Sequence, residues 1–361
     1  MDKLRLRRSI GIVTTEQHID FFKSNIRESI VLKMNNPQIV MLLQCFDGNT
    51  TIEQVCEKYQ IHDVVQLEKL LAYLHQEYIL IHQDVPYPLD LVENKIRLLN
   101  LLEDYCHSTS EVIAKVKELA NKTVMIIGLG AVGSFVTMQL VQFGVSNLIF
   151  VDKDCVDESN LHRQYYFEEQ IGKPKSKVLQ QEILAINPDC HIEIIEDFLT
   201  ADFFIKHEIP TSLDLIINCA DEPNVDTTSR IVAKYAMKQR IPHIVGGGYN
   251  LHLTLIGQTI IPFQTACFEC FNLFLKDLND ASLRNVKKLH RENRKLGSFA
   301  PLSGIASNLA ALDAFKLLIG RVDKLQQANK RIEFNSALHK FSVMQVNRSE
   351  KCKWCGNEQY Y

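Results

Sequence analysis

The sequence predicts an α/β protein whose main body is a doubly wound, mostly parallel sheet of Rossmann-like type, with a smaller domain in front of it. Two observations predict this fold. From residue 121 onward, short hydrophobic runs alternate with helical patterns, which is typical of βαβ units. A glycine-rich turn, Gly128-x-Gly130-x-x-Gly133, joins the first of these runs to the first helix. In such a turn the N–H groups at the start of the helix can meet phosphates.

Composition excludes several classes of protein. The chain has 361 residues, 46% of them hydrophobic, which is enough for a full core and two or three domains. The formal net charge of -3 gives no electrostatic reason to expect a nucleic-acid partner. No apolar run approaches the length of a membrane span, and the one after the basic N-terminal cluster is too short for a signal peptide. We therefore expect a cytoplasmic protein without nucleic-acid or membrane partners.

Residues 1–85 are predicted to form a small winged-helix-like domain. The expected elements are strands near 9–13, 18–22 and 29–34, helices over 37–46, 50–59 and 65–77, and a strand over 78–82. Its helices lack a basic face for reading DNA. Two interpretations remain, a packing or oligomerisation domain and a peptide clamp that adds a peptide strand to an exposed sheet edge beside a helix groove.

Residues 86–120 are expected to be a linker and helices, and residues 121–361 the main domain. Its predicted strands cover 123–127, 147–152, 191–196, 213–219 and 242–245, and its helices cover 131–143, 175–186, 224–239 and 298–320. Alternation within 251–261 predicts antiparallel strands. The polar and basic segment 272–297 is expected to be a crossover loop, either solvated or acting as a lid.

Four of the ten cysteines form two pairs with a two-residue gap, Cys267 with Cys270 and Cys352 with Cys355. Each pair can direct two thiolates at one ion, and two pairs complete a tetrahedral shell, so they predict a structural zinc site. Paired redox cysteines are the alternative. The other six cysteines stand singly in hydrophobic segments and are expected to be reduced.

The glycine turn and an acidic residue predict a nucleotide site. Asp152 ends the second predicted strand, at the spacing where a carboxylate takes ribose hydroxyls. Asp154 either joins this site or caps the following turn. These residues alone leave a dinucleotide and ATP equally open.

A longer ordered set of motifs resembles the ubiquitin-activating superfamily, which includes ThiF and MoeB. The resemblance spans about residues 95–356. It is carried by the glycine turn, Asp152-x-Asp154, Asn160-Leu-His-Arg163-Gln164, Gly172-Lys-Pro-Lys175, Cys219-Ala-Asp221 and the two cysteine pairs. Gly247-Gly248-Tyr249, Ser298-Phe-Ala-Pro301 and the N-terminal domain are similar to the peptide-modifying subgroup represented by MccB and PaaA, with PaaA the nearer match.

The resemblance implies ATP-dependent adenylation with magnesium. Arg163 and Lys175 match the family positions that meet the α-phosphate and the leaving pyrophosphate, and Asp221 matches the magnesium-binding carboxylate. Asn160 and Gln164 would hydrogen-bond phosphates or ribose. Arg97 resembles an arginine that family dimers insert into the neighbour's ATP site, so a homodimer is expected.

The subgroup implies a ribosomally made precursor peptide as the partner, held by the N-terminal domain. Residues 271–351 contain no cysteine, so we do not expect a thioester intermediate. Glutamate carboxyl activation followed by ring closure is the leading hypothesis for an enzyme of RiPP antibiotic biosynthesis. Its alternatives are activation of a terminal carboxamide as in MccB, activation of a sulfur carrier as in ThiF and MoeB, a non-catalytic scaffold and a nicotinamide-dependent dehydrogenase. The candidate general bases, His162, Tyr249 and His252, are not distinguished by the sequence.

Overall fold

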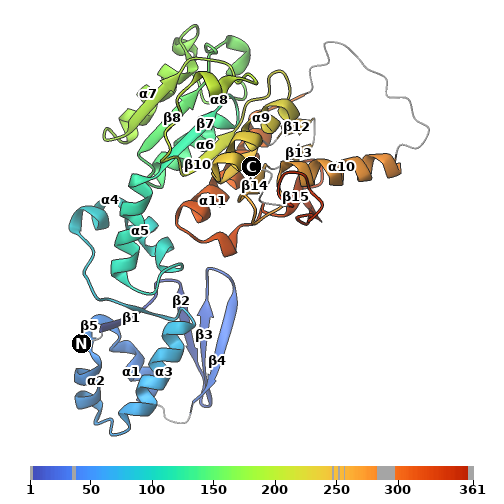
Figure 1. Ribbon diagram of the computed structural model, residues 1–361. Helices are drawn as coiled ribbons and strands as arrows, with labels where there is room; N and C mark the ends of the chain where they lie inside the picture. The colour runs from blue at the N-terminus through green and yellow to red at the C-terminus, as the bar shows by residue number, and fades with distance from the viewer. Residues whose placement is uncertain are drawn as a thin grey trace. The chain divides into compact units, whose positions relative to one another are not determined.

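The computed structural model describes residues 3–34, 38–245, 248–250, 253–255, 257–282 and 297–356. The chain divides into two compact units, residues 1–118 and 119–361, which are described separately (Figure 1). Three sequence expectations lie outside the described residues: the candidate base His252, the motif residue Gly247 and the basic side chains of 283–296.

The first unit contains two small antiparallel sheets and five helices. Its strands are β1 (Lys3–Leu6), β2 (Ile10–Thr14), β3 (His18–Lys23), β4 (Glu28–Lys33), β5 (Asp47–Thr51) and β6 (Leu80–His82). Its helices are α1 (Gln38–Gln44), α2 (Ile52–Tyr59), α3 (Val64–Gln76), α4 (Leu89–Glu103) and α5 (Thr109–Asn121), the last of which runs into the second unit. The sheets have the orders β5-β1-β6 and β2-β3-β4. The sequence analysis missed β1 and β5, because β1 is only four residues long and β5 contains no hydrophobic side chain.

Local signals explain the helix starts in this unit. Thr51 caps α2 in a capping box with Gln54, and Asp63 caps α3 by accepting from the Gln66 N–H. The face of α3 that carries Leu67, Leu71 and Leu74 is buried against the sheets. These helices therefore form where capping and apolar periodicity coincide.

Segment 86–118 packs within the first unit, on the strands and helices that precede it. The buried Arg7 guanidinium donates to the carbonyl oxygens of Leu80, at 3.1 Å, and Cys106, at 2.7 Å. Arg5 pairs with the buried Glu103 carboxylate at 2.5 Å. These bonds join β1 and β6 to the end of α4.

The second unit is built on a six-stranded sheet with the order β14-β11-β10-β7-β8-β9. Its strands are β7 (Thr123–Ile127), β8 (Asn147–Val151), β9 (His191–Ile195), β10 (Leu215–Asn218), β11 (His243–Val245) and β14 (Gln258–Ile260). All neighbours are parallel except β11 and β14, so the predicted α/β class with a mostly parallel sheet is confirmed.

Helices of the second unit pack in two groups. They are α6 (Gly133–Gln142), α7 (Lys175–Ile186), α8 (Phe203–Lys206), α9 (Val225–Gln239), α10 (Phe268–Ser282) and α11 (Ala300–Leu318). Helix α6 packs against α7 and α11, whereas α9 packs against β10, β11 and α10. No helix in the described part of the chain is long and apolar enough to cross a membrane.

Two features of the second unit correct the sequence expectations. Residues 272–282 belong to helix α10 and not to a crossover loop, because Phe268 and Phe271 bury one face of that helix. The hairpin β15 (Lys330–Asn335) and β16 (Lys340–Gln345) was not predicted. It completes a second sheet with β12 (Gly248–Asn250) and β13 (Leu253–Leu255), in the order β12-β13-β15-β16.

Candidate functional site

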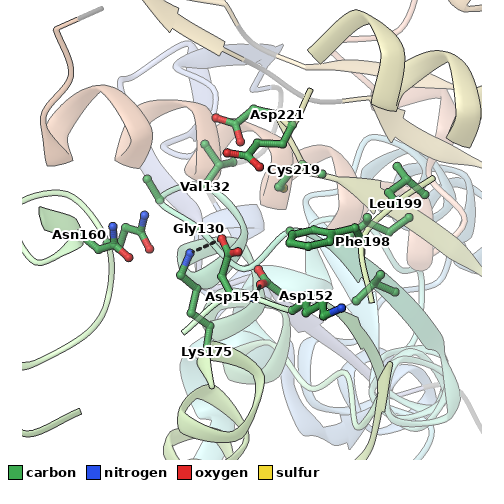
Figure 2. Close-up of a pocket in the computed structure, with 18 of the residues that line it drawn as sticks. Gly130, Val132, Asp152, Asp154, Asn160, Lys175, Phe198, Leu199, Cys219 and Asp221 are labelled. Atoms are coloured by element: carbon green, nitrogen blue, oxygen red, sulfur yellow. Dashed lines mark hydrogen bonds and ion pairs between the residues drawn. The ribbon is translucent and has the colours of Figure 1, made fainter. Parts of the chain in front are cut away.

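The second unit has a cleft of about 400 Å³ at the carboxyl ends of β7, β8, β9 and β10 (Figure 2). This is the edge where open α/β sheets bind ligands, and the volume suits a nucleotide. The residues that line it include nine predicted for the site, which are Gly128, Gly130, Asp152, Asp154, Asn160, Arg163, Gln164, Lys175 and Asp221. The structure thus brings together residues that span 94 positions of sequence, from 128 to 221.

Each of the three positions in the turn favours glycine for a different structural reason. Gly128 has a φ of 86°, and a Cβ there would lie 2.7 Å from the Ala220 backbone nitrogen, because the ends of β7 and β10 approach closely. A Cβ on Gly133 would lie 1.9 Å from the Gly128 carbonyl oxygen, so Gly133 lets α6 begin against the turn. A Cβ on Gly130 would meet only Gln164 Nε2, at 3.8 Å. Gly130 therefore leaves room on the cleft side of the turn.

Asp152 holds the turn in place. Its carboxylate accepts hydrogen bonds from the Leu129 N–H, at 2.6 Å, and from the Asp154 N–H, at 2.7 Å. Burial raises the pKa of Asp152, and these two hydrogen bonds together with nearby Lys175 oppose that rise. The side chain lines the cleft, where its oxygens can also receive ligand hydroxyls.

Lys175 is a buried cation at the start of α7. Its ammonium group pairs with Asp154 at 2.9 Å, and its backbone N–H donates to the Asp154 carbonyl oxygen, also at 2.9 Å (Figure 2). The Lys175 residue is 5% exposed, whereas the Asp154 side chain is 52% exposed. Asp154 therefore aims the lysine into the cleft while remaining open to solvent.

The segment that carries Asn160, Arg163 and Gln164 is folded tightly on itself. The Arg163 and Gln164 N–H groups donate to the Asn160 carbonyl oxygen, and Arg163 Nη1 donates to the Ser159 carbonyl oxygen at 2.6 Å. Arg163 has no carboxylate partner among the described residues, so its charge is available to a ligand. The buried Gln164 Oε1 accepts no hydrogen bond from the described protein, and buried acceptors usually have a partner.

Asp221 lines the cleft just beyond the end of β10. Its carboxylate is exposed, and Figure 2 shows it at the cleft with the Cys219 side chain beneath it. Glu222, which follows, also lines the cleft. Magnesium prefers carboxylate and phosphate oxygens, so this donor set fits the ion predicted from the sequence.

Several cleft residues were missed by the sequence analysis. Lys153 lines the cleft beside Asp152, and Phe198 and Leu199 form a wall just after β9. Their position just after a predicted parallel strand could have indicated Phe198 and Leu199, because neighbouring parallel strands end at the same edge of the sheet. Cys219 also lines the cleft, where burial raises the pKa of its thiol to about 12. That thiol is protonated at neutral pH and is a poor nucleophile.

Three predicted residues do not line the cleft: Gly133, which begins α6, Arg97 and His162. Arg97 lies on α4 of the first unit with an exposed side chain. His162 is exposed and contacts Arg163 Nη1 through Nε2 at 3.3 Å. For the candidate base Tyr249, the structure describes the backbone alone, as part of β12.

The four paired cysteines form one buried cluster. Cys267, Cys270, Cys352 and Cys355 have sulfur atoms that all lie within 4.8 Å of one another. The Sγ atoms of Cys267 and Cys352 are 3.5 Å apart, and those of Cys270 and Cys355 are 3.4 Å apart. A tetrahedral zinc–thiolate shell with bonds of about 2.3 Å has sulfur separations of about 3.8 Å, so the cluster fits zinc.

Comparison with protein families matches residues 107–355 to the ThiF family. The sulfur carrier protein ThiS adenylyltransferase of Escherichia coli is 29% identical over 242 residues, which cover 66% of this chain and 88% of that protein. The molybdopterin-synthase adenylyltransferase of the same organism is 26% identical over 250 residues, which cover 66% of this chain and 88% of that protein.

Solved structures extend the likeness to the first unit. A crystal structure of E. coli MccB with MccA-N7isoASN has a TM-score of 0.79 at 22% identity and covers 99% of this chain and 100% of that chain. A structure of PaaA has a TM-score of 0.70 at 19% identity and covers 95% of this chain and 100% of that chain. At these identities the likeness establishes a shared fold.

Proposed function

The chain belongs to the ThiF family, and on that premise we propose that it uses ATP and magnesium to adenylate a carboxyl group of a ribosomally made precursor peptide. The activated carboxyl belongs to a glutamate side chain, and the reaction ends in ring closure within the peptide, as a step of RiPP antibiotic biosynthesis. The observation that carries the proposal is the cleft, where the glycine turn lies together with the cations Arg163 and Lys175 and the exposed carboxylate of Asp221.

The proposed chemistry has two steps. A carboxylate oxygen attacks the α-phosphorus, the bond to the bridging oxygen breaks, and pyrophosphate leaves with its electron pair. A nucleophile of the same peptide then attacks the acyl carbon and AMP leaves. Negative charge gathers on the phosphoryl oxygens in the first step, where Arg163, Lys175 and the N–H groups of the turn would stabilise it. Magnesium, held by Asp221 and the phosphates, would supply further positive charge.

The positions of the cysteines support direct use of the acyl adenylate. Residues 271–351 contain no cysteine. Cys219, which lines the cleft, has a thiol whose pKa is raised to about 12, so thiolate is scarce at neutral pH. Among the described residues, the cysteine that lines the cleft therefore does not offer a ready thiolate for a thioester relay.

The first unit supports a peptide as the substrate. A cavity of about 240 Å³ lies between the β2-β3-β4 sheet and helices α1 and α3, lined mainly by apolar side chains such as Phe21, Leu43 and Leu74. A second cavity of about 270 Å³ shares Ile39 and Leu70 with it. Strand β4 is the edge of its sheet in the described structure, so an extended peptide could pair with it. The adenylyltransferase relatives cover only 66% of this chain, whereas structures of MccB, one of them with N-formylated MccA, cover 99%.

The decisive experiment combines the purified protein, MgATP and synthetic peptides encoded beside its gene. Pyrophosphate release and a product lighter than the peptide by one water are expected. A peptide–nucleotide adduct would instead favour the MccB-like reaction on a terminal carboxamide. Activity toward a diglycine-ended sulfur carrier that survives deletion of residues 1–88 would favour the ThiF-like alternative. Absence of pyrophosphate release with every peptide and carrier would contradict the proposal and favour a scaffold, and binding of NADH without ATP would favour a dehydrogenase.

A further inference from the structure

A buried tyrosine lies next to the glycine turn but outside the cleft. Tyr166 is 4% exposed and does not line the cleft. Its hydroxyl donates to the Leu129 carbonyl oxygen at 2.7 Å. Leu129 stands between Gly128 and Gly130 in the turn and is itself buried. Tyr166 therefore bonds to the turn from the protein interior.

The peptide groups of Leu129 are held from two directions. The Leu129 N–H donates to Asp152 Oδ2 at 2.6 Å, and the Leu129 carbonyl oxygen accepts from Tyr166. A carbonyl oxygen engaged with a buried hydroxyl does not turn its negative dipole toward a phosphate in the cleft. The bond to Tyr166 thus favours the turn conformation in which neighbouring N–H groups can meet phosphates.

The Tyr166 ring packs on an element that carries a cation of the cleft. It forms a small buried cluster with Val156 and Val178. Val178 lies on α7, three residues after Lys175 at the start of that helix. Tyr166 itself comes three residues after Arg163. One buried side chain therefore joins the glycine turn, the segment of Arg163 and the helix of Lys175.

The Tyr166 hydroxyl keeps its proton. Burial raises its pKa well above the ordinary value of about 10, and the nearby carboxylates of Asp152 and Asp154 raise the pKa further. The hydroxyl is therefore a hydrogen-bond donor at every pH where the protein would work. Loss of this donor would leave the buried Leu129 carbonyl oxygen without the Tyr166 bond, which is unfavourable for the observed conformation of the turn.

We propose that Tyr166 is a positioning residue that holds the glycine turn, Arg163 and Lys175 in the arrangement that binds a triphosphate. The inference rests on the proposed function, since it takes ATP to lie in the cleft. Tyr166 contacts none of the reacting atoms and acts through the turn and the two cations. Its hydroxyl is the group specific to this role, because the ring also belongs to an apolar cluster.

The test compares the unaltered full-length protein with Tyr166→Phe, which removes the hydroxyl and keeps the ring. Calorimetry with MgATP and with magnesium tripolyphosphate should show about 10-fold weaker binding of both, because the lost hydrogen bond acts on the phosphate site. Amide hydrogen exchange should become faster at residues 128–134 and stay unchanged in the strands of the main sheet.

A double-mutant cycle separates positioning from a general loss of stability. In an Arg163→Ala protein, Tyr166 has one cation fewer to position. Adding Tyr166→Phe there should cost at least about threefold less affinity for MgATP than it costs in the unaltered protein. Tyr235→Phe is the matched control, because the Tyr235 ring is half-buried, stacks on Phe204 and does not line the cleft. It should change neither affinity.

Unchanged binding of both ligands by Tyr166→Phe would overturn the inference while the proposed function stands. A loss confined to MgATP would also overturn it, since Tyr166 would then not act on the phosphate site. The same conclusion would follow from equal losses with and without Arg163, or from faster exchange throughout the second unit. Failure of the unaltered protein to bind MgATP would contradict the proposed function itself.

Discussion

Arg163 brings to the cleft a positive charge that no carboxylate of the described residues neutralises. Its guanidinium donates to a backbone carbonyl and has no carboxylate partner among the described residues, whereas Lys175 is already paired with Asp154. A cation without a carboxylate partner can give its full interaction to a transition state that gathers negative charge.

Arg163→Ala should therefore lower peptide-dependent pyrophosphate release by at least about 100-fold, with Arg163→Lys losing less. Lys173→Ala is the matched control, because Lys173 is an exposed cation two residues before Lys175. Circular dichroism and zinc content should stay unchanged in all three variants. Near-normal turnover by Arg163→Ala would remove Arg163 from its proposed role.

His243 links the stability of the main sheet to pH. It lies fully buried in β11, where burial lowers its pKa to about 4 from the ordinary value of about 6.5. Between pH 6.5 and pH 4, His243 is protonated in the unfolded chain but stays neutral in the folded chain. The free energy of unfolding should thus fall by about 3 kcal/mol between pH 6.5 and pH 4 and gain nothing from His243 above pH 6.5.

Urea titrations across this range test the prediction. His243→Asn should flatten that part of the pH dependence, since an amide can donate to the Ile241 carbonyl oxygen without titrating. His191→Asn, which changes an exposed histidine, should leave the pH dependence of the free energy of unfolding unchanged. An identical slope in the His243→Asn protein would contradict the assignment.

At the scale of elements, the cysteine cluster joins the start of α10 to the C-terminal segment. Cys267 directly precedes α10 and Cys270 lies in its first turn, while Cys352 and Cys355 lie beyond the β15–β16 hairpin. Phe271, Val346 and the half-buried Trp354 pack in the same core. Metal binding to such a cluster stabilises the folded state, because the unfolded chain does not hold the four thiolates together.

Cys352→Ser is expected to abolish stoichiometric zinc binding and to lower the melting temperature by roughly 5–10 °C, since about 2–3 kcal/mol moves a unit of this size by that much. Elemental analysis and thermal scans would measure both effects. Cys155→Ser, which alters an exposed cysteine outside the cluster, should bind one zinc per chain as before. A Cys352→Ser protein that melts normally would argue against a structural metal.

Elements with strong local signals were predicted well. The expected helix over 175–186 is α7 itself, since Pro174 precedes it and apolar residues recur on one face. Helix α10 was missed because its second half leads directly into the polar, basic stretch beyond residue 282, and the whole of 272–297 was interpreted as one loop. The β15–β16 hairpin was missed because β16 is largely exposed, so its pattern resembles that of a surface loop.

At the scale of the whole molecule, the chain is two compact units, and the expected homodimer remains a proposal. In the proposed homodimer, Arg97 of one subunit completes the ATP site of the other. Arg97 is an exposed residue of the first unit. A residue that acts across a two-fold interface leaves a distinctive signature when two defective proteins are mixed.

Arg97→Ala and Arg163→Ala should each be inactive alone. After subunit exchange in equal amounts, about a quarter of the activity should return, because half of the dimers are mixed and each mixed dimer has one intact site. Arg97→Ala mixed with itself is the control. No recovery in a preparation that sedimentation shows to be dimeric would mean that Arg97 acts within its own chain or not at all.

The sequence by itself determined the α/β class, the glycine-rich turn, the two cysteine pairs and most cleft residues at the ends of β7, β8 and β10. These features are encoded by short-range spacing, because a tight turn, a two-residue knuckle and a helix cap each depend on neighbouring residues. Only the tertiary structure decided that Phe198 joins the cleft and that Asp154 pairs with Lys175. Parallel strands bring distant segments to one edge of the sheet, and no local pattern records which side chains meet there.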